Sequence, residues 1–156
     1  MIATVTAAGL EHYEVSNFAR PGHRCRHNET YWLGKTYFAV GPGAARYVAG
    51  RRETNHRSTG TYLKRVLAGE SPVADAETLS DEDRARERLV FGLRRLEGIS
   101  PPQFLAETGF DLLSLGGSPL QKWLAQGMLS LSPTHLRLTR QGLLVSDSLW
   151  PSLLQA

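Results

Sequence analysis

The sequence predicts an incomplete α/β module followed by a mainly α-helical, winged-helix-like domain. Three observations predict this order. Residues 1–67 suit a helix, a strand, a loop, a second strand and a glycine-rich turn, whereas residues 80–156 suit three helices and a hairpin. The length of 156 residues is too short for a complete (β/α) barrel, which needs roughly 200–250 residues. Residues 68–79 are small and polar, which predicts a linker between the two domains.

The first module is expected to begin with a helix and a strand. Residues 2–6 suit the end of an amphipathic helix, and Gly9 supplies its C-terminal stop. Residues 13–18 alternate between apolar and polar side chains, which predicts a strand. Residues 19–28 contain a Pro-Gly pair and are therefore expected to form a loop.

The module then continues with a second strand. Residues 37–40 are predicted to form it, and they lead directly into a glycine-rich turn at residues 41–45. Two strands and one partial helix cannot cover both faces of a parallel sheet. The module is therefore expected to be incomplete on its own.

The second module carries clear helix signals. Ser80 and the acidic residues after it predict a helix start, and Gly98 is expected to end that helix. Between them, apolar residues recur at helical spacing, at Ala85, Leu89, Leu93 and Leu96. Ser100 and Ser118 each precede a proline and have a glutamine three positions later, which predicts two further capped helices.

A hairpin and a final helix complete this module. Residues 128–131 and 135–139 alternate on both sides of a short turn, which predicts a β-hairpin. A last helix is expected from Arg140 onward. Three helices with a hairpin suggest a winged-helix-like arrangement, for which DNA binding is one function. The helix expected at residues 118–127 contains Lys122 as its only basic residue, so we expect no nucleic-acid partner.

The charge is distributed unevenly along the chain. Residues 1–66 contain ten basic and four acidic groups, a net charge of +6, whereas residues 67–156 have a net charge of −3. Fifteen of the eighteen basic residues are arginines, which suit the carboxylate or phosphate groups of an anionic ligand. A solvated surface that forms ion pairs with the acidic half explains the same numbers. Glu11 and Glu14 are expected to lie on this polar surface.

The single cysteine restricts the possible chemistry. Cys25 alone excludes a disulfide framework, a thiolate zinc site and an iron–sulfur cluster held by the chain's own cysteines. The apolar runs are too short to span a membrane, and residues 1–10 lack the features of a signal peptide. We therefore expect a reducing, cytoplasmic location.

The candidate binding residues are in the first module. His27 is expected in a loop after a strand, where a neutral imidazole can bind a metal ion or a heme iron. Asn28 can orient the ring, and Tyr31 and Trp32 offer flat apolar area to a flat ligand. The alternative is a capped loop whose aromatic side chains close the rim of the fold.

Two other features of this module suggest ligands more weakly. His23 and Cys25 lie near His27, but a structural zinc site needs four ligands, so zinc is not expected; a transient second heme ligand from either residue stays open. Gly41 and Gly43 follow a predicted strand, where glycines let a ligand approach the backbone. They form neither a dinucleotide fingerprint nor a P-loop.

Several segments together resemble a known family. Residues 14–22 (EVSNFARPG), 25–32 (CRHNETYW) and 37–44 (YFAVGPGA) are similar to the HemW proteins. Residues 93–98 (LRRLEG) and 138–145 (LTRQGLLV) resemble the C-terminal domain of that family. These are radical S-adenosylmethionine proteins, also described as oxygen-independent coproporphyrinogen III oxidase-like. The resemblance covers essentially the whole chain.

The resemblance implies roles for particular residues. The histidine of the His-Asn-x-x-Tyr-Trp motif is implicated in heme binding, which carries over to His27 as ligand of the heme iron. The rest of the motif is matched by Asn28, Tyr31 and Trp32. The end of the last barrel strand, near which relatives hold S-adenosylmethionine, is matched by Gly41, Gly43 and Ala45.

The sequence also departs from the family. Nothing in it matches the Cys-x-x-x-Cys-x-x-Cys motif that holds the [4Fe–4S] cluster, or the upstream residues for S-adenosylmethionine. The chain therefore looks like a C-terminal fragment, with residues 1–67 as the end of a partial radical S-adenosylmethionine barrel. The cluster and S-adenosylmethionine are expected only in the intact parent protein, and the fragment alone is expected to be inactive as a radical enzyme.

The expected function is that of the parent protein, namely heme binding and delivery to acceptor hemoproteins. The alternatives are a coproporphyrinogen III oxidase of porphyrin biosynthesis and a winged-helix nucleic-acid-binding module. The motif at residues 27–32 favours heme binding over the oxidase. The oligomeric state stays open, with a homodimer of the intact protein as one option.

Overall fold

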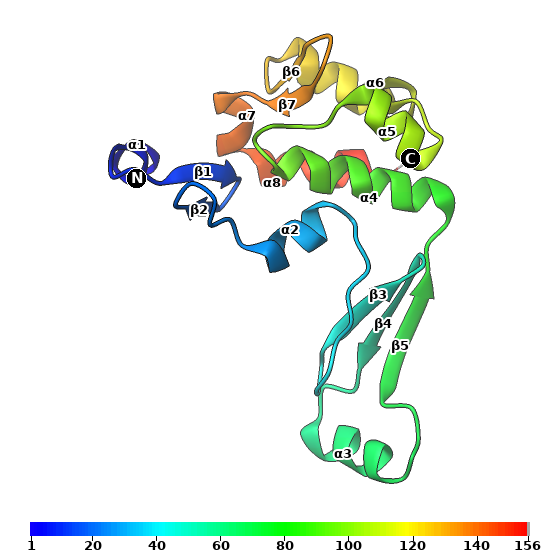
Figure 1. Cartoon of the computed structure of the whole chain (residues 1–156). Coiled ribbons are helices and arrows are strands. Elements are labelled where there is room, and N and C mark those ends of the chain that lie inside the picture. Colours follow the sequence, from blue (N-terminus) through cyan, green and yellow to red (C-terminus); the bar gives the residue numbers. More distant parts are fainter. Residues whose placement is uncertain (156) are drawn as a thin grey trace. The chain divides into compact units, whose positions relative to one another are not determined.

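The computed structural model describes residues 1–155 and separates into two compact units (Figure 1). One unit combines residues 1–34 with the segment that begins at residue 85, and we call it the helical unit. The other consists of residues 35–84, and we call it the sheet unit. These limits differ from the domains expected at residues 1–67 and 80–156. Each unit is described by itself.

The N-terminal segment of the helical unit forms two short helices and a hairpin. Its elements in order are α1 (Ile2–Ala7), β1 (Glu11–Glu14), β2 (Asn17–Ala19) and α2 (Arg26–Trp32). The helix predicted before Gly9 is therefore confirmed. The single strand predicted for residues 13–18 is wrong, because the chain turns at Val15 and Ser16 and β1 pairs with β2 in antiparallel fashion.

The loop predicted for residues 19–28 is shorter than expected. Helix α2 already begins at Arg26, so His27 and Asn28 lie on a helix and not in a loop. The residue before this helix is Cys25, whose side chain makes no capping hydrogen bond. The usual N-cap signal is therefore missing from the sequence at this point.

The C-terminal segment contains most of the helices. Its elements are α4 (Asp81–Arg94), α5 (Pro101–Thr108), α6 (Leu112–Ala125), β6 (Leu129–Leu131), β7 (Leu136–Leu138), α7 (Arg140–Leu144) and α8 (Ser146–Leu154). The helix start after Ser80 is confirmed, because the Ser80 hydroxyl accepts the Asp83 backbone N–H at 3.1 Å. The predicted hairpin is confirmed as the antiparallel pair of β6 and β7.

Two helix predictions in this segment need correction. The Ser100 side chain makes no capping hydrogen bond, although α5 does begin with two prolines. Helix α6 begins at Leu112, earlier than expected, and bends at Gly117, whose φ is 52° and ψ is −146°. The stretch after Ser118 is thus the second half of a longer, broken helix.

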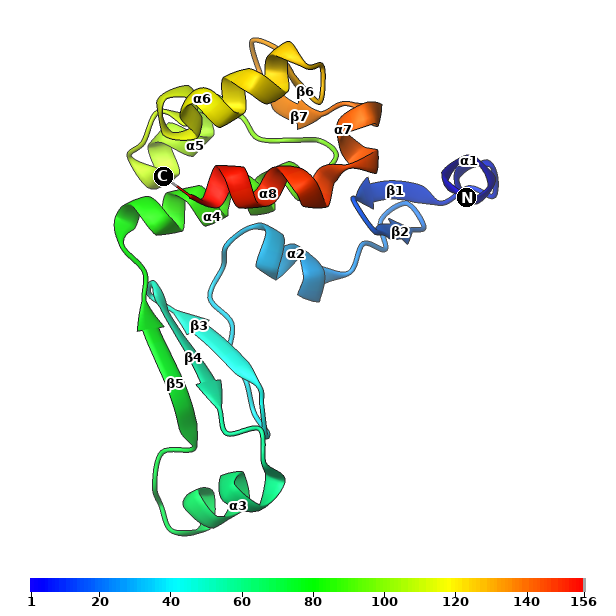
Figure 2. The same ribbon diagram turned by 180° about the vertical axis from the view of Figure 1, so that it is seen from behind.

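The hydrophobic core belongs to this C-terminal segment. Helices α4 and α8, which overlap in the views of Figures 1 and 2, both contribute to one buried cluster. The side chains with at most 1% exposure in this cluster are Ala85, Leu89, Leu93, Phe104, Leu112, Leu120, Leu136, Leu149 and Leu153. Full burial of each large apolar side chain contributes about 1.5–3 kcal/mol, so this cluster dominates the stability of the unit.

The sheet unit is a three-stranded antiparallel sheet with one helix. Strands β3 (Ala45–Val48), β4 (Arg51–Asn55) and β5 (Val73–Thr78) pair in the order β3-β4-β5, and α3 (Thr59–Leu67) connects β4 to β5 (Figure 2). All strand pairs in residues 1–155 are antiparallel, so the parallel strands expected for the first module are not present there.

Two further predictions fail in the sheet unit. Residues 37–40 do not form a strand; Tyr37 makes a single isolated bridge to Tyr47. The predicted linker at residues 68–79 contains β5, because the backbone of residues 73–78 pairs with β4. The apolar residues that alternate with Asp75 and Glu77 in this strand are small alanines, and most of the strand is exposed, so its pattern is weak and is easily read as a linker.

Candidate functional site

Helix α2 carries all four residues of the candidate ligand motif. His27 is exposed, whereas Asn28, Tyr31 and Trp32 are half-buried. His27 and Tyr31 are four residues apart, so they lie on the same side of the helix. The Tyr31 hydroxyl lies 3.1 Å from His27 Nε2, and the two rings meet edge to face with centroids 4.9 Å apart. The structure therefore brings His27 and Tyr31 together.

Trp32 lies against α4. Its ring has the Arg94 guanidinium over one face, 4.4 Å from the ring centroid, and Phe91 at a centroid distance of 6.1 Å. The buried indole N–H has no hydrogen-bond partner within residues 1–155. The flat surface expected for a ligand is therefore partly used to attach α2 to α4.

The guanidinium on Trp32 is held by a buried acid. Arg94 Nη2 lies 2.7 Å from Glu14 Oε1, and the Glu14 side chain is fully buried. The other carboxylate oxygen of Glu14 accepts hydrogen bonds from the Ser16 backbone N–H, at 3.0 Å, and from the Asn17 side chain. Glu14 was expected on the polar surface, and that prediction is wrong.

This burial could not be recognised from a sequence pattern, because the partner of Glu14 lies far along the chain. The local signal is the Glu-Val-Ser-Asn stretch, in which both Ser16 and Asn17 turn back to the Glu14 carboxylate. Glu14 and Arg94 are thus two residues of the site that sequence reasoning did not assign to it.

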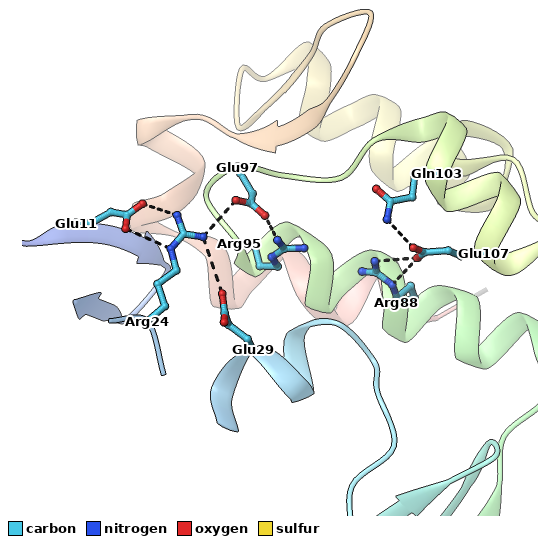
Figure 3. Close-up of polar contacts among 8 residues, drawn as sticks. All are labelled: Glu11, Arg24, Glu29, Arg88, Arg95, Glu97, Gln103 and Glu107. Carbon is cyan, nitrogen blue, oxygen red and sulfur yellow. Dashed lines mark hydrogen bonds and ion pairs between the residues drawn. The ribbon is translucent and has the colours of Figure 1, made fainter. Parts of the chain in front are cut away.

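A second group of charges surrounds the start of α2 (Figure 3). Arg24 pairs with Glu11 of β1, and its Nη1 lies 3.3 Å from Glu97 and 4.0 Å from Glu29 of α2. The hydrogen bond to Arg24 lowers the pKa of Glu11, and the same bond raises the pKa of Arg24. The Arg24 guanidinium also lies 5.4 Å from the centroid of the Tyr13 ring. Arg24 therefore links the hairpin, α2 and the turn after α4.

Neighbouring arginines of α4 and the turn after it are also paired with acids. Figure 3 shows Arg95 with Glu97, and Arg88 with Glu107 of α5 at 2.9 Å. Gln103 donates a hydrogen bond to Glu107 at 2.7 Å. Burial lowers the pKa of Arg95, and the positive charge of Arg88 lowers it further. These contacts fix α4, on which Trp32 packs.

His23 and Cys25 do not form a metal cluster with His27. Both are exposed, and the Cys25 backbone N–H donates to the Tyr13 hydroxyl at 3.3 Å. Within residues 1–155 there is no group of three or more His, Cys, Asp or Glu side chains able to hold a metal ion.

The glycine-rich turn belongs to the other unit. Gly41, Gly43 and Ala45 all lie in the sheet unit, whereas α2 lies in the helical unit. The Gly41 backbone N–H donates to the Tyr62 hydroxyl at 3.1 Å, and the Gly43 N–H donates to the His56 carbonyl at 3.0 Å. These two donors are therefore used within the fold, and Ala45 is the first residue of β3.

Comparison with known proteins gives one family description. Residues 79–145 match the HemN C-terminal domain. The chain is 30% identical over 154 residues to the heme chaperone HemW of Bacillus subtilis (strain 168), covering 99% of this chain and 41% of that protein. It is 35% identical over 156 residues to the heme chaperone HemW of Mycobacterium tuberculosis (strain CDC 1551 / Oshkosh), with coverage of 97% and 37%.

One solved structure has a similar fold. It is coproporphyrinogen III oxidase (HemN) from Escherichia coli, described as a radical SAM enzyme, with a TM-score of 0.77 and 14% identity. The match covers 97% of this chain and 38% of that structure. The architecture is therefore a mixed α/β arrangement like the C-terminal part of HemN. The chain spans about two fifths of the length of the relatives it matches.

The helices within residues 1–155 are short or only partly apolar. None of them is both long and apolar enough to cross a bilayer.

Proposed function

The chain is a C-terminal region of the HemW/HemN-like type, and we propose that it forms the heme-holding part of a HemW-type heme chaperone. In this proposal His27 is the axial ligand of the heme iron. Heme is the cargo, and acceptor hemoproteins receive it. The two relatives named above are both called heme chaperones, and their similarity extends over nearly the whole of this chain.

The observation that carries the proposal is the state of the His27 imidazole. It is exposed on a helix, and a tyrosine hydroxyl lies against its Nε2. A hydrogen bond at one ring nitrogen orients the imidazole and selects the tautomer, so that the other nitrogen can bind a metal. Tyr31 therefore acts as the orienting group that Asn28 was expected to be.

Two exposed arginines in the same N-terminal segment suit the propionates of heme. Arg20 and Arg26 are exposed, and neither forms an ion pair within residues 1–155. Arg26 is adjacent to His27 in α2. Guanidinium groups bind carboxylates well because their fork-shaped donors match two oxygens. Most of the nearby arginines are already paired, so these two are the ones we assign to the propionates.

The iron–sulfur cluster of a radical S-adenosylmethionine protein does not fit the residues of this chain. A [4Fe–4S] cluster needs several thiolates, and the chain contains only Cys25. No step of the proposed function therefore involves the cluster. A contact of Gly41, Gly43 and Ala45 with S-adenosylmethionine stays a prediction. Such a contact would be made by the backbone. The N–H groups of Gly41 and Gly43 would not take part, because they already donate hydrogen bonds within the fold.

Titration of the 156-residue chain with hemin, followed at the Soret band, tests the role of His27. We expect His27→Ala to weaken binding at least about tenfold, equivalent to about 1.4 kcal/mol, and to shift the Soret maximum. His135→Ala is the matched control, because His135 lies in the β6–β7 hairpin away from α2. His23→Ala and Cys25→Ala test for a second ligand. Equal spectra and affinities for wild type and His27→Ala would overturn the assignment.

The finer parts of the fold belong to the same proposal. We infer that the N-terminal segment corresponds to the end of the barrel in a radical S-adenosylmethionine protein, and that the C-terminal segment with its β6–β7 hairpin is winged-helix-like. The fold similarity to HemN supports the first inference, and the helix–hairpin–helix order supports the second. The cytoplasmic location, the homodimer and the absence of a nucleic-acid partner stay predictions.

The oxidase alternative has weaker support. Its basis is the structure of HemN, which is only 14% identical and therefore shows the fold alone. The named relatives with 30–35% identity are heme chaperones. We therefore retain heme binding as the function that the site supports best.

A further inference from the structure

We infer that Glu14 and Arg94 are positioning residues for His27, which they influence by fixing Trp32 and with it helix α2. This inference rests on the proposed function, in which His27 binds the heme iron. Neither Glu14 nor Arg94 needs to contact the heme. Their role is to keep the ligand-bearing helix in one position.

Helix α2 has little stability of its own. It contains seven residues, lacks a side-chain cap and has no buried residue. Isolated helices shorter than about 12–15 residues are marginal in water. The position of α2 must therefore be set by contacts of its side chains with the rest of the helical unit.

Trp32 supplies the apolar part of that attachment. Its ring contacts Phe91 and carries the Arg94 guanidinium on one face, both from α4. A guanidinium over an indole face is a directional contact, because the cation must lie above the ring to gain from its quadrupole. Trp32 and His27 belong to the same short helix, so fixing the indole restricts where His27 can lie.

Glu14 in turn fixes the guanidinium. Its carboxylate is fully buried, and one oxygen contacts Arg94 Nη2. The other oxygen accepts hydrogen bonds from the Ser16 backbone N–H and the Asn17 side-chain amide. A buried acid without its partner is costly, so the two charges must stay together. A backbone hydrogen bond also joins the turn after Glu14 to the end of α4, because the Val15 N–H donates to the Arg94 carbonyl at 3.0 Å.

The arrangement resembles the outer shell of a metal site. Groups that do not touch the metal orient the ligands, and their loss weakens binding even though every ligand is present. A ligand held within a narrow range of positions loses less freedom when it binds. Glu14, Arg94 and Trp32 therefore form a chain of contacts from the buried interior to the ligand helix.

Amide hydrogen exchange in the heme-free chain measures the positioning role without using heme. In Arg94→Lys the charge partner of Glu14 is kept, but the planar group on Trp32 is lost. We expect the amides of residues 26–34 to exchange about threefold to thirtyfold faster, as for the loss of one cation–π contact. Peptides from α5 and α6 are expected to keep their wild-type rates. Trp32→Leu is expected to have the same local effect, and Trp32→Phe a smaller one.

Glu107→Gln is the matched control, because it removes an ion pair to Arg88 on the same helix α4 without touching Trp32. Hemin titration of the same variants completes the experiment. We expect Arg94→Lys and Trp32→Leu to weaken hemin binding by about threefold to tenfold, as for a lost positioning contact, and Glu107→Gln to leave it unchanged.

The outcomes separate the two proposals. If His27→Ala weakens hemin binding but Arg94→Lys and Trp32→Leu leave α2 exchange at the wild-type rate, the positioning role is wrong and the heme ligand stands. If α2 exchange rises in both variants but His27→Ala binds hemin normally, the contacts fix α2 and the proposed function is wrong. A uniform rise of exchange in α5 and α6 would also contradict a local positioning role.

Discussion

The helical unit and the sheet unit are held together by different forces. The helical unit contains every member of the hydrophobic core. In the sheet unit, by contrast, Gly50 and Asn55 are the only buried residues of positions 35–84. The helical unit thus depends on apolar burial, whereas the sheet unit depends on backbone hydrogen bonds and ion pairs. The two kinds of stabilisation can occur in one chain because each unit makes its own internal contacts.

The side chains of the sheet explain this difference. Strand β4 reads Arg-Arg-Glu-Thr-Asn, so it offers polar groups to both faces of the sheet. Glu53 pairs with Arg46 and Arg51, and Arg52 pairs with Glu77 across the strands. The large apolar side chains of this unit stay exposed, among them Phe38, Val40, Leu63, Val66 and Leu67. Exposed ion pairs contribute little each, about 0–1 kcal/mol, so the sheet unit is expected to open more easily.

The largest expected effect comes from truncating one leucine in each unit, a buried one in the helical unit and an exposed one in the sheet unit. Leu93→Ala removes a fully buried side chain from α4 and is expected to lower the free energy of unfolding by about 3–5 kcal/mol. Leu67→Ala in α3 removes a side chain that is 84% exposed, and we expect a change below about 0.5 kcal/mol. Urea unfolding of both variants gives the two values. Similar losses would mean that the sheet unit has a core of its own.

A smaller effect is expected from adding one methyl group to a glycine. Gly98 and Gly69 both have positive φ, at 81° and 72°. A Cβ on Gly98 would lie 2.2 Å from the Leu136 carbonyl oxygen, whereas the space beside Gly69 is open. We expect Gly98→Ala to lower the free energy of unfolding by about 2–4 kcal/mol. We expect Gly69→Ala to lower it by about 1–2 kcal/mol, because only the positive φ is unfavourable for alanine there. Thermal unfolding followed by circular dichroism compares them, and equal shifts would refute the crowding argument.

The smallest expected effect concerns acid. Hydrogen bonds from Arg51 and Arg46 lower the pKa of Glu53, and the bond from Arg24 lowers that of Glu11, both from 4.5. Because the folded pKa is depressed, the stabilisation is complete above pH 4.5 and is lost as the pH falls through the folded value. Glu53→Gln should therefore reduce the loss of amide-exchange protection in the sheet unit as the pH falls. Glu11→Gln should have the same effect in the helical unit. A change in the opposite unit would contradict their independence.

Sequence reasoning succeeded where the signal is local. The start of α4 after Ser80 and the β6–β7 hairpin follow from caps and alternation, which act over a few residues. His27 and Tyr31, two of the predicted ligand residues, lie in contact on α2, and their role in binding stays a prediction. Each of these features can be read from a short window.

It failed where the deciding contact is distant or lacks a pattern. Helix α2 starts without a side-chain cap, so the position of His27 on a helix had no local sign. The burial of Glu14 depends on Arg94, and the strand at residues 73–78 depends on pairing with β4. Residues 37–40 form a short apolar run that suits a strand, yet only Tyr37 makes an isolated bridge, to Tyr47. Local propensity is overruled in all these cases by tertiary contacts.

The discontinuity of the helical unit has a consequence for the order of events during translation. Arg24 and Glu97 are 73 positions apart, and the sheet unit lies between them in the chain. At about 5–20 residues per second, the ribosome needs roughly 4–15 s to make that stretch. The histidine helix is therefore synthesised well before its supports exist. The contacts of α2 with α4, and of Arg24 with Glu97, can form only after those residues have emerged. In the proposed function, the heme site would therefore be completed by the segment that is made later.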